Sequence, residues 1–150
     1  FSITVNATWR KDENLIEGLQ RLVTEFKVNT LVDSHLKGSE ENFKDLPNPQ
    51  AVALFHICQE ALANIAKHAK AHHVNVVGWR TSDRALIEVK DDGRGFELEK
   101  IKKSIGHGLS NMETRAANVG GELDITTEPG QGTSVLAWVP IPESEPLPVE

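Results

Sequence analysis

The chain has 150 residues, a net charge of -6 and a single cysteine. This length suits one domain with a buried core, whereas the acidic balance argues against a nucleic-acid-binding surface, which needs positive charge to displace counterions. One cysteine excludes a disulfide framework and fits a reducing compartment, and the lack of a signal peptide or of an apolar run of about 18 residues indicates a cytoplasmic domain without membrane contact.

The first half of the chain predicts two helices and one strand. Apolar residues at helical spacing predict an amphipathic helix over residues 13–27, and strand-like residues follow over 30–36. A solvated turn then leads to a long helix over 49–70. Asn48 is expected to cap this helix, because it precedes Pro49, whose fixed φ suits a first helical turn.

The second half predicts two strand pairs separated by a helix. Alternating apolar residues indicate an antiparallel pair over 74–80 and 85–90, and another over 122–127 and 133–139. The helix is predicted over 109–119 and ends at a glycine pair. This order of elements favours a two-layer α/β sandwich, with a mixed sheet and the helices on one face.

The ends of the chain are expected to lie outside this domain, which spans residues 13–139. Residues 1–12 are predicted to be a linker remnant or an edge strand. Residues 140–150 alternate proline with glutamate and are predicted to be a disordered tail. Because the chain starts with Phe1, we expect it to be part of a longer protein, which could itself be anchored in a membrane.

A polar stripe interrupts the long helix of residues 49–70. At about 100° per residue, Glu60, Asn64 and Lys67 span an arc of about 60°. One interpretation is an ordinary solvated face. The other is that the Asn64 amide oxygen binds Mg²⁺, which needs few protein ligands, and that Lys67 neutralises phosphate charge.

Asp91 follows the predicted strand of residues 85–90 and precedes two glycines, Gly93 and Gly95. A buried carboxylate here can accept a hydrogen bond from the exocyclic amine of adenine, whereas guanine presents an oxygen there. The glycines would let the backbone approach a purine, or would satisfy positive φ. Thr133 could place its hydroxyl near Asp91, or simply favour a strand. An ordinary Asp-Gly turn is the alternative.

A glycine pair introduces the helix predicted over 109–119. Gly106, His107 and Gly108 lead directly to Leu109, and unpaired N–H groups at a helix start form an anion site. The sequence equally allows a flexible hinge at this position. These residues are therefore candidates for phosphate contact.

The histidines and the cysteine offer no nucleophile. None of the six histidines precedes an acidic residue, and His72 and His73 have no metal-ligand spacing, so we interpret them as structural or exposed. Cys58 lies at an apolar helical position, which predicts a packed core thiol.

Taken together, these motifs resemble the catalytic ATP-binding domain of a sensor histidine kinase, in the superfamily shared with DNA gyrase, heat-shock chaperones and mismatch-repair ATPases. The nitrate-sensor-like branch with a short lid is the most similar. The matching residues are the N box (Glu60, Asn64, Lys67, His68), the G1 box (Asp91, Gly93, Gly95), the G2 box (Gly106, His107, Gly108, Leu109) and the trailing Thr133.

The resemblance implies a Bergerat-type fold that binds ATP with Mg²⁺ and transfers the γ-phosphoryl group to a histidine. That histidine would lie on a dimerising helical hairpin N-terminal to the domain, in a full-length homodimer. A response regulator, typically with a helix-turn-helix output, would be the partner. The resemblance gives Glu60 and Lys67 catalytic roles, Asn64 the metal, and the remaining motif residues the nucleotide.

Two other functions stay open from the sequence. An anti-sigma-factor serine kinase shares this fold and ATP site but phosphorylates a protein hydroxyl. A nucleotide-dependent interaction module would bind ATP without catalysis. The presence of Glu60, Asn64 and Asp91 together favours a catalytic domain.

Overall fold

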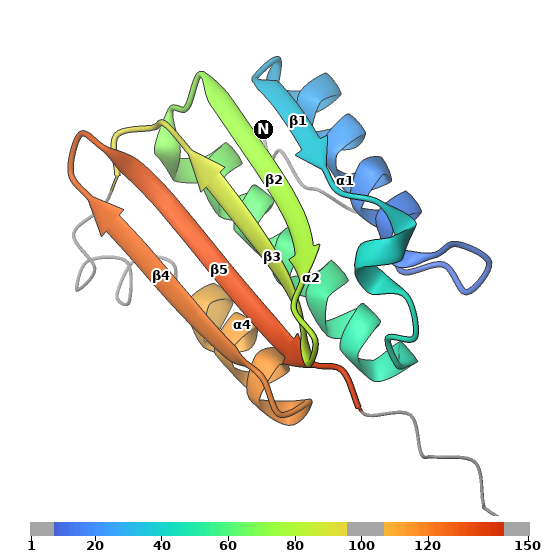
Figure 1. The fold of residues 1–150 in the computed structure, drawn as a ribbon. Helices are drawn as coiled ribbons and strands as arrows, with labels where there is room; N and C mark the ends of the chain where they lie inside the picture. The colour runs from blue at the N-terminus through green and yellow to red at the C-terminus, as the bar shows by residue number, and fades with distance from the viewer. Residues whose placement is uncertain (1–7, 96–106, 143–150) are drawn as a thin grey trace, which may run out of the picture.

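One mixed sheet forms the frame of the domain in this computed structural model, which describes residues 8–95 and 107–142. The strand order is β1-β2-β3-β5-β4 (Figure 1). β1 pairs in parallel with β2, and the other neighbours are antiparallel. The strands are β1 (Asp33–Lys37), β2 (His73–Arg80), β3 (Arg84–Asp91), β4 (Glu122–Glu128) and β5 (Gly132–Pro140).

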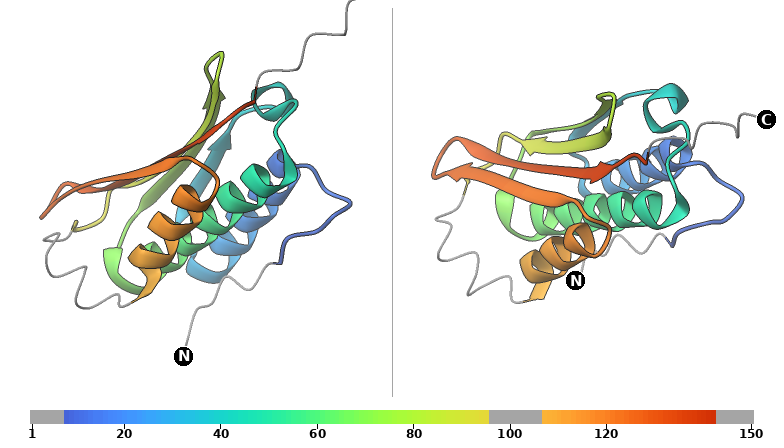
Figure 2. Two further views of the ribbon diagram at one scale, coloured as in Figure 1. Left: turned by 90° about the horizontal axis from the view of Figure 1, so that it is seen from below. Right: turned by 60° about the horizontal axis from the view of Figure 1, so that its bottom comes forward.

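Three α-helices cover one face of this sheet, and the opposite face is uncovered by helices within the described residues (Figure 2). They are α1 (Leu15–Thr30), α2 (Asn48–Asn64) and α4 (His107–Asn118). A short 3₁₀ turn, η1 (Glu40–Phe43), precedes α2, and a π turn, η2 (Ile65–Ala69), follows it. The two-layer α/β sandwich predicted from the sequence is confirmed. In residues 8–95 and 107–142 no helix has both the length and the hydropathy needed to cross a bilayer.

Local interactions define the ends of α1. The Asn14 side chain accepts from the Glu17 N–H at 2.9 Å, and the Glu17 carboxylate accepts from the Asn14 N–H at 3.1 Å, which forms a capping box. Leu31 ends the helix in a left-handed conformation with φ of 60°. The helix therefore lies two to three residues later in the sequence than its apolar pattern predicted.

The predicted cap of α2 is wrong. Asn48 is the first helical residue, Pro47 holds the cap position, and no side chain caps this end. The reason is a backbone bond one residue earlier than expected, since the Pro47 carbonyl accepts the Ala51 N–H at 3.1 Å. Pro49 does lie in the first turn, as predicted.

The core lies between the helices and the inner face of the sheet. Burying one large apolar side chain there stabilises the fold by roughly 1.5–3 kcal/mol. Cys58 is part of this core, as predicted, and desolvation raises the pKa of its thiol to about 12. The largest fully buried side chains are Phe26, Phe55, Leu19, Leu22, Leu54, Ile57, Leu62, Ile87, Met112, Val74, Val76 and Val89.

The sheet extends slightly beyond its predicted end. β5 continues to Pro140, and Ile141 is buried with its N–H donating to the Asp83 carbonyl at 2.8 Å. Residues 8–12 form no strand. The rest of the predicted tail and linker, residues 143–150 and 1–7, lies outside the described residues.

Candidate functional site

The N-box segment (residues 60–68) spans a change of helix type. Glu60 and Asn64 are half-buried near the end of α2, and the chain then widens into the π turn η2. The Ile65 N–H is shared between the Ala61 and Leu62 carbonyls. The predicted uniform α-helical arc therefore holds for Glu60 and Asn64 but not for Lys67, because the wider winding rotates the residues after Asn64. π turns of this kind are frequent at functional sites.

Lys67 and His68 lie within the π turn. The Lys67 side chain is exposed, so its ammonium group can reach a solvent-side anion. The His68 carbonyl accepts a hydrogen bond from Arg94 Nε at 2.8 Å. Desolvation, followed by the charges of Lys67 and Arg94, lowers the pKa of the His68 ring, which favours the neutral form of this imidazole.

Asp91 has one carboxylate oxygen that no described group satisfies. The side chain is 3% exposed at the end of β3, between Val74 of β2 and Thr133 of β5. Its Oδ1 accepts the Gly93 N–H at 2.8 Å, whereas its Oδ2 is buried without a partner in the described part of the chain. Because an unpaired buried acceptor costs about 1–3 kcal/mol, a ligand donor at Oδ2 would be favoured.

Desolvation raises the pKa of Asp91, and the backbone N–H groups of Gly93 and, more weakly, of Thr133 oppose this shift. The charge of the neighbouring Asp92 raises the pKa further. The carboxylate is therefore held in an environment that disfavours its own charge. Such an acceptor gains more from a new hydrogen-bond donor than an exposed carboxylate would.

Close backbone packing fixes the G1 turn (residues 91–95). Gly95 has φ of 66°, and a Cβ there would lie 1.9 Å from the Glu128 carbonyl oxygen. A Cβ at Gly132 would lie 2.1 Å from the Asp91 carbonyl oxygen. The Gly130 N–H also donates to the Arg94 carbonyl. Gly95 thus serves the contact with the β4–β5 hairpin, in addition to satisfying positive φ.

Thr133 lies opposite Asp91 in the sheet, and its hydroxyl pairs with the Thr127 hydroxyl at 2.8 Å. Both threonines, Asp91 and Gly132 line a cavity of about 190 Å³. A larger hollow of about 690 Å³ runs along α1 but contains none of the predicted site residues. Two buried side-chain atoms lack a partner among the described residues, Trp9 Nε1 and Asp91 Oδ2. We assign the site to the cavity at Asp91, because only this second atom belongs to a predicted motif.

The G2 box begins α4, as its glycines suggested. His107 is the first residue of the helix, Gly108 is half-buried and Leu109 is buried in the core. Gly106 and the His107 side chain lie outside the described residues. The structure therefore places a helix N-terminus at the motif but does not describe the loop before it.

A protein-family profile, described as histidine kinase-, DNA gyrase B- and HSP90-like ATPase, matches residues 50–143. The chain belongs to this ATPase family. The match includes the predicted N, G1 and G2 boxes and Thr133, so all of the candidate site residues lie within it.

Individual proteins support the same grouping. The chain is 37% identical over 136 residues to the signal transduction histidine-protein kinase/phosphatase DegS of Brevibacillus brevis, covering 89% of this chain and 34% of that protein. It is 34% identical over 131 residues to the sensor histidine kinase LiaS of Bacillus subtilis, covering 86% and 35% respectively. The chain thus spans about a third of the length of these relatives.

Solved structures support the fold. The histidine kinase domain of the blue-light activated histidine kinase from Erythrobacter litoralis EL346 matches with a TM-score of 0.72 and 21% identity. The match covers 91% of this chain and 66% of that chain. At this identity, the similarity shows that the two chains share a fold.

Two side chains of the candidate site were not predicted from the sequence. Arg94 joins the G1 turn to the N-box segment through the His68 carbonyl, and Asp92 accepts hydrogen bonds from the backbone at the start of β2. The adjacent acidic pair Asp91-Asp92 was a visible signal. The sequence alone indicates no role for Asp92, because its hydrogen-bond partners lie 19 and 20 residues away along the chain.

The sequence predicts one metal ligand at this site, the side-chain amide of Asn64. Among the residues that the structure describes, no group of three or more His, Cys, Asp or Glu side chains could hold a metal ion. The half-buried Asn64 remains the candidate ligand. This arrangement fits Mg²⁺ held mainly by nucleotide phosphates and water, rather than a site built entirely from protein groups.

Proposed function

We propose that this chain is the Mg-ATP-binding catalytic domain of a two-component sensor histidine kinase. It would transfer the γ-phosphoryl group of ATP to a histidine on a separate dimerising helical hairpin. Membership of the ATPase family and relatives named as histidine kinases support this assignment. The observation that carries it is the buried Asp91 Oδ2, an acceptor without a partner among the described residues.

Adenine recognition would follow from the two oxygens of Asp91. Oδ1 is occupied by the Gly93 N–H, so Oδ2 is the oxygen left to accept the exocyclic amine of adenine. Guanine would present a carbonyl oxygen to the same carboxylate, and two acceptors repel each other. Asp91 would therefore select ATP over GTP.

Phosphate binding would use two helix ends, the C-terminal end of α2 with η2 and the N-terminal end of α4. Asn64 would hold Mg²⁺, which when bound neutralises negative charge on the phosphate oxygens. Lys67 would add an ammonium group, and the N–H groups at the start of α4, near Gly108 and Leu109, would orient the phosphate chain. His68 and His107, which belong to the same motifs, would also contact the nucleotide.

Glu60 is the proposed base of the transfer step. The acceptor imidazole nitrogen forms a bond to the γ-phosphorus as the bond from that phosphorus to the bridging oxygen breaks, and ADP leaves. Glu60, half-buried four residues before Asn64, would orient the imidazole or take its proton. In this proposal the full-length protein is a cytoplasmic-facing homodimer whose partner is a response regulator.

Calorimetry with wild type and two matched variants tests nucleotide recognition. Asp91→Asn keeps the shape of the side chain but places an amide donor where Oδ2 accepts. We expect it to weaken Mg-ATP binding about 100-fold and to reduce discrimination against Mg-GTP. Asp124→Asn, on an exposed residue of β4, serves as the control and should bind like wild type. Equal ATP affinity in wild type and Asp91→Asn would refute the role of Asp91.

The chemistry of transfer requires a second experiment. The domain would be supplied with a relative's histidine-bearing hairpin and with radiolabelled ATP, and the product would be treated with acid. Loss of label in acid indicates phosphohistidine, whereas acid-stable label indicates a serine kinase. ATP binding without any labelled product would favour a non-catalytic interaction module.

A further inference from the structure

Asp92 lies beside the proposed adenine-binding residue but faces a different part of the molecule. Its Oδ1 accepts the backbone N–H groups of His72 at 2.9 Å and His73 at 2.8 Å. Its Oδ2 lies 2.8 Å from His73 Nδ1, and its own N–H donates to the His73 carbonyl at 3.2 Å. Four contacts therefore tie this one residue of the G1 turn to the start of β2.

These contacts restrain the backbone from which Asp91 projects. Asp91 already pairs with Val74 of β2 and Thr133 of β5, and the next residue along the chain is held by His73. Loosening Asp92 would free the turn on its β2 side. The hydrogen bonds of Gly93 to Asp91, of Arg94 to the π turn and of Gly130 to the Arg94 carbonyl would remain. The position of the Asp91 carboxylate therefore depends on whether Asp92 is held.

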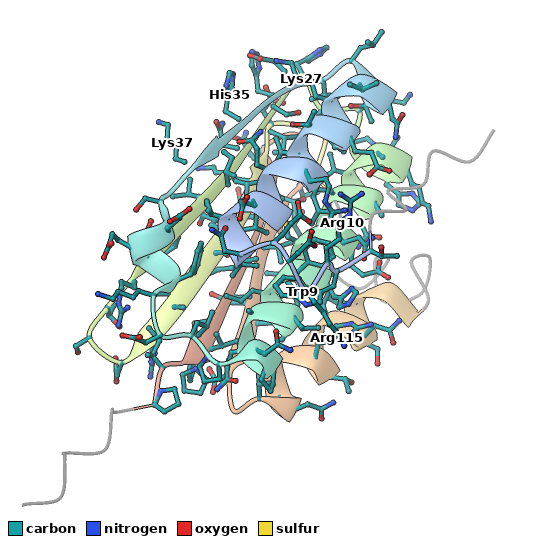
Figure 3. All side chains as sticks on the ribbon, turned by 90° about the vertical axis from the view of Figure 1, so that its right-hand side faces the viewer. Trp9, Arg10, Lys27, His35, Lys37 and Arg115 are labelled. Carbon is teal, nitrogen blue, oxygen red and sulfur yellow. The ribbon has the colours of Figure 1, made fainter. Side chains whose placement is uncertain are left out.

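The His73 ring, which contacts Asp92, can change its charge with pH. The charged groups in contact with the His73 ring are Asp92 and, at 3.8 Å from Nε2, Asp33 of β1. Asp33 is also 2.9 Å from His35 Nε2, and His35 projects from β1 on the side away from α1 (Figure 3). A protonated His73 would thus lie between two carboxylates, and a neutral His73 would lose the charge attraction to each of them.

We propose that Asp92 is a positioning residue for Asp91 and that protonation of His73 strengthens its hold, so that adenine-nucleotide affinity falls as His73 deprotonates. This inference rests on the proposed function. A free N–H on the ring lets neutral His73 keep one hydrogen bond to Asp92, so the effect is a tuning of affinity rather than a loss of binding.

The direction of both pKa shifts supports this reading. The hydrogen bond from Asp92 and then its charge raise the pKa of His73. Desolvation favours the protonated form of Asp92, but the hydrogen bonds from His73 and His72 outweigh it and lower the pKa of Asp92 to about 2. Because the folded pKa of His73 is raised, the ion pair is fully present below the unfolded pKa and is lost as pH rises through the folded pKa.

The test is the affinity of the domain for Mg-ADP at about pH 6 and pH 8.5, measured by calorimetry. Nucleotide phosphates titrate in the same range, so the informative quantity is the ratio of dissociation constants of His73→Gln and wild type at each pH. We expect His73→Gln to bind about two- to fivefold more weakly at the lower pH and equally at the higher pH, since exposed ion pairs are modest. His72→Gln keeps its backbone N–H and should match wild type throughout.

A double-mutant cycle separates positioning from general stability. In the Asp92→Asn background, the ratio of dissociation constants with and without His73→Gln should no longer depend on pH. Adding His73→Gln to Asp92→Asn should therefore cause no further loss of Mg-ADP affinity at about pH 6. Melting temperatures of the unliganded variants report any purely structural effect, which would leave the ratio of dissociation constants constant with pH. Wild type that fails to bind Mg-ADP would overturn both this inference and the proposed function. If wild type binds Mg-ADP but the ratio of dissociation constants does not change with pH, this inference alone is overturned. Additive effects of Asp92→Asn and His73→Gln on affinity would overturn it as well.

Discussion

The G1 turn and the N-box segment both belong to the candidate site, but different forces hold them. Contacts to three other parts of the fold fix the turn: β2 through Asp92, the π turn through Arg94, and the β4–β5 hairpin through Gly130. The N-box segment instead presents half-buried or exposed side chains, Glu60 and Lys67 among them, on a helix that changes winding at Asn64.

This difference separates two tasks that a nucleotide site must perform. Recognition of a flat base needs an acceptor held in one place, and in the proposed function the sheet end would hold Asp91 in this way. Phosphate transfer needs charged side chains that can change position as the phosphoryl group moves. Side chains on the exposed face of a helix end would have this freedom. Changes in the turn should therefore affect folding and base affinity, while changes in the N-box segment should affect metal use and transfer.

The largest expected effect concerns transfer. Glu60→Ala should slow phosphorylation of a supplied hairpin by about 10²- to 10⁴-fold while leaving Mg-ATP affinity within a few-fold of wild type. Glu113→Ala, on an exposed residue of α4, is the matched control. The measurement is the initial rate of label transfer at saturating ATP. A Glu60→Ala variant with near-normal transfer would show that this glutamate has no role in the step.

The next effect concerns folding of the turn. Gly95→Ala would force a Cβ into the Glu128 carbonyl and should lower the free energy of unfolding by at least about 3 kcal/mol. Gly130→Ala has a similar positive φ but meets nothing within 4 Å, so only the conformational cost of about 1–2 kcal/mol applies. Urea unfolding of both variants makes the comparison. Equal losses would mean that the hairpin contact does not constrain the turn.

A smaller effect should distinguish metal binding from base binding. Asn64→Ala should remove the gain in ATP affinity that Mg²⁺ provides, so that ATP binds about tenfold more weakly in the presence of Mg²⁺. The affinity for metal-free ATP should be unchanged. Asp91→Asn should weaken binding with and without Mg²⁺ alike. Titrations in the presence of Mg²⁺ and of a chelator give both values. If Asn64→Ala keeps the full Mg²⁺ effect, another group holds the metal.

The smallest effect is a pH dependence of stability. A carboxyl group whose pKa is raised on folding opposes folding when ionised, and this penalty disappears as pH falls through the folded pKa. Unliganded Asp91→Asn should therefore melt at a higher temperature than wild type at about pH 8, with the difference shrinking toward about pH 4. Thermal melts across this range test it. A variant less stable than wild type at every pH would contradict the burial of an ionised carboxylate.

Periodicity in the sequence was sufficient for the architecture. The stripe of Leu19, Leu22 and Phe26 predicted α1, and alternation predicted both antiparallel strand pairs, because side-chain spacing records which face is buried. Periodicity could not locate the cap of α2. The cap depends on which backbone carbonyl near Pro47 and Pro49 accepts the first helical hydrogen bond.

The candidate site was predictable where neighbours in sequence form it. Asp91 and Gly93 are two residues apart, and their hydrogen bond could be anticipated from an Asp-x-Gly pattern. The π turn was not predictable, because a shift in backbone hydrogen bonding leaves no mark on side-chain pattern. Nor was the pairing of Asp92 with His73, since tertiary folding alone brings these residues together.

The most direct test of the account is a crystal structure of the wild-type domain with Mg-ADP. We expect the exocyclic amine of adenine to lie about 2.7–3.2 Å from Asp91 Oδ2, with the Gly93 N–H still on Oδ1. An adenine bound elsewhere, or an Asp91 Oδ2 paired with another protein group while nucleotide is bound, would contradict it.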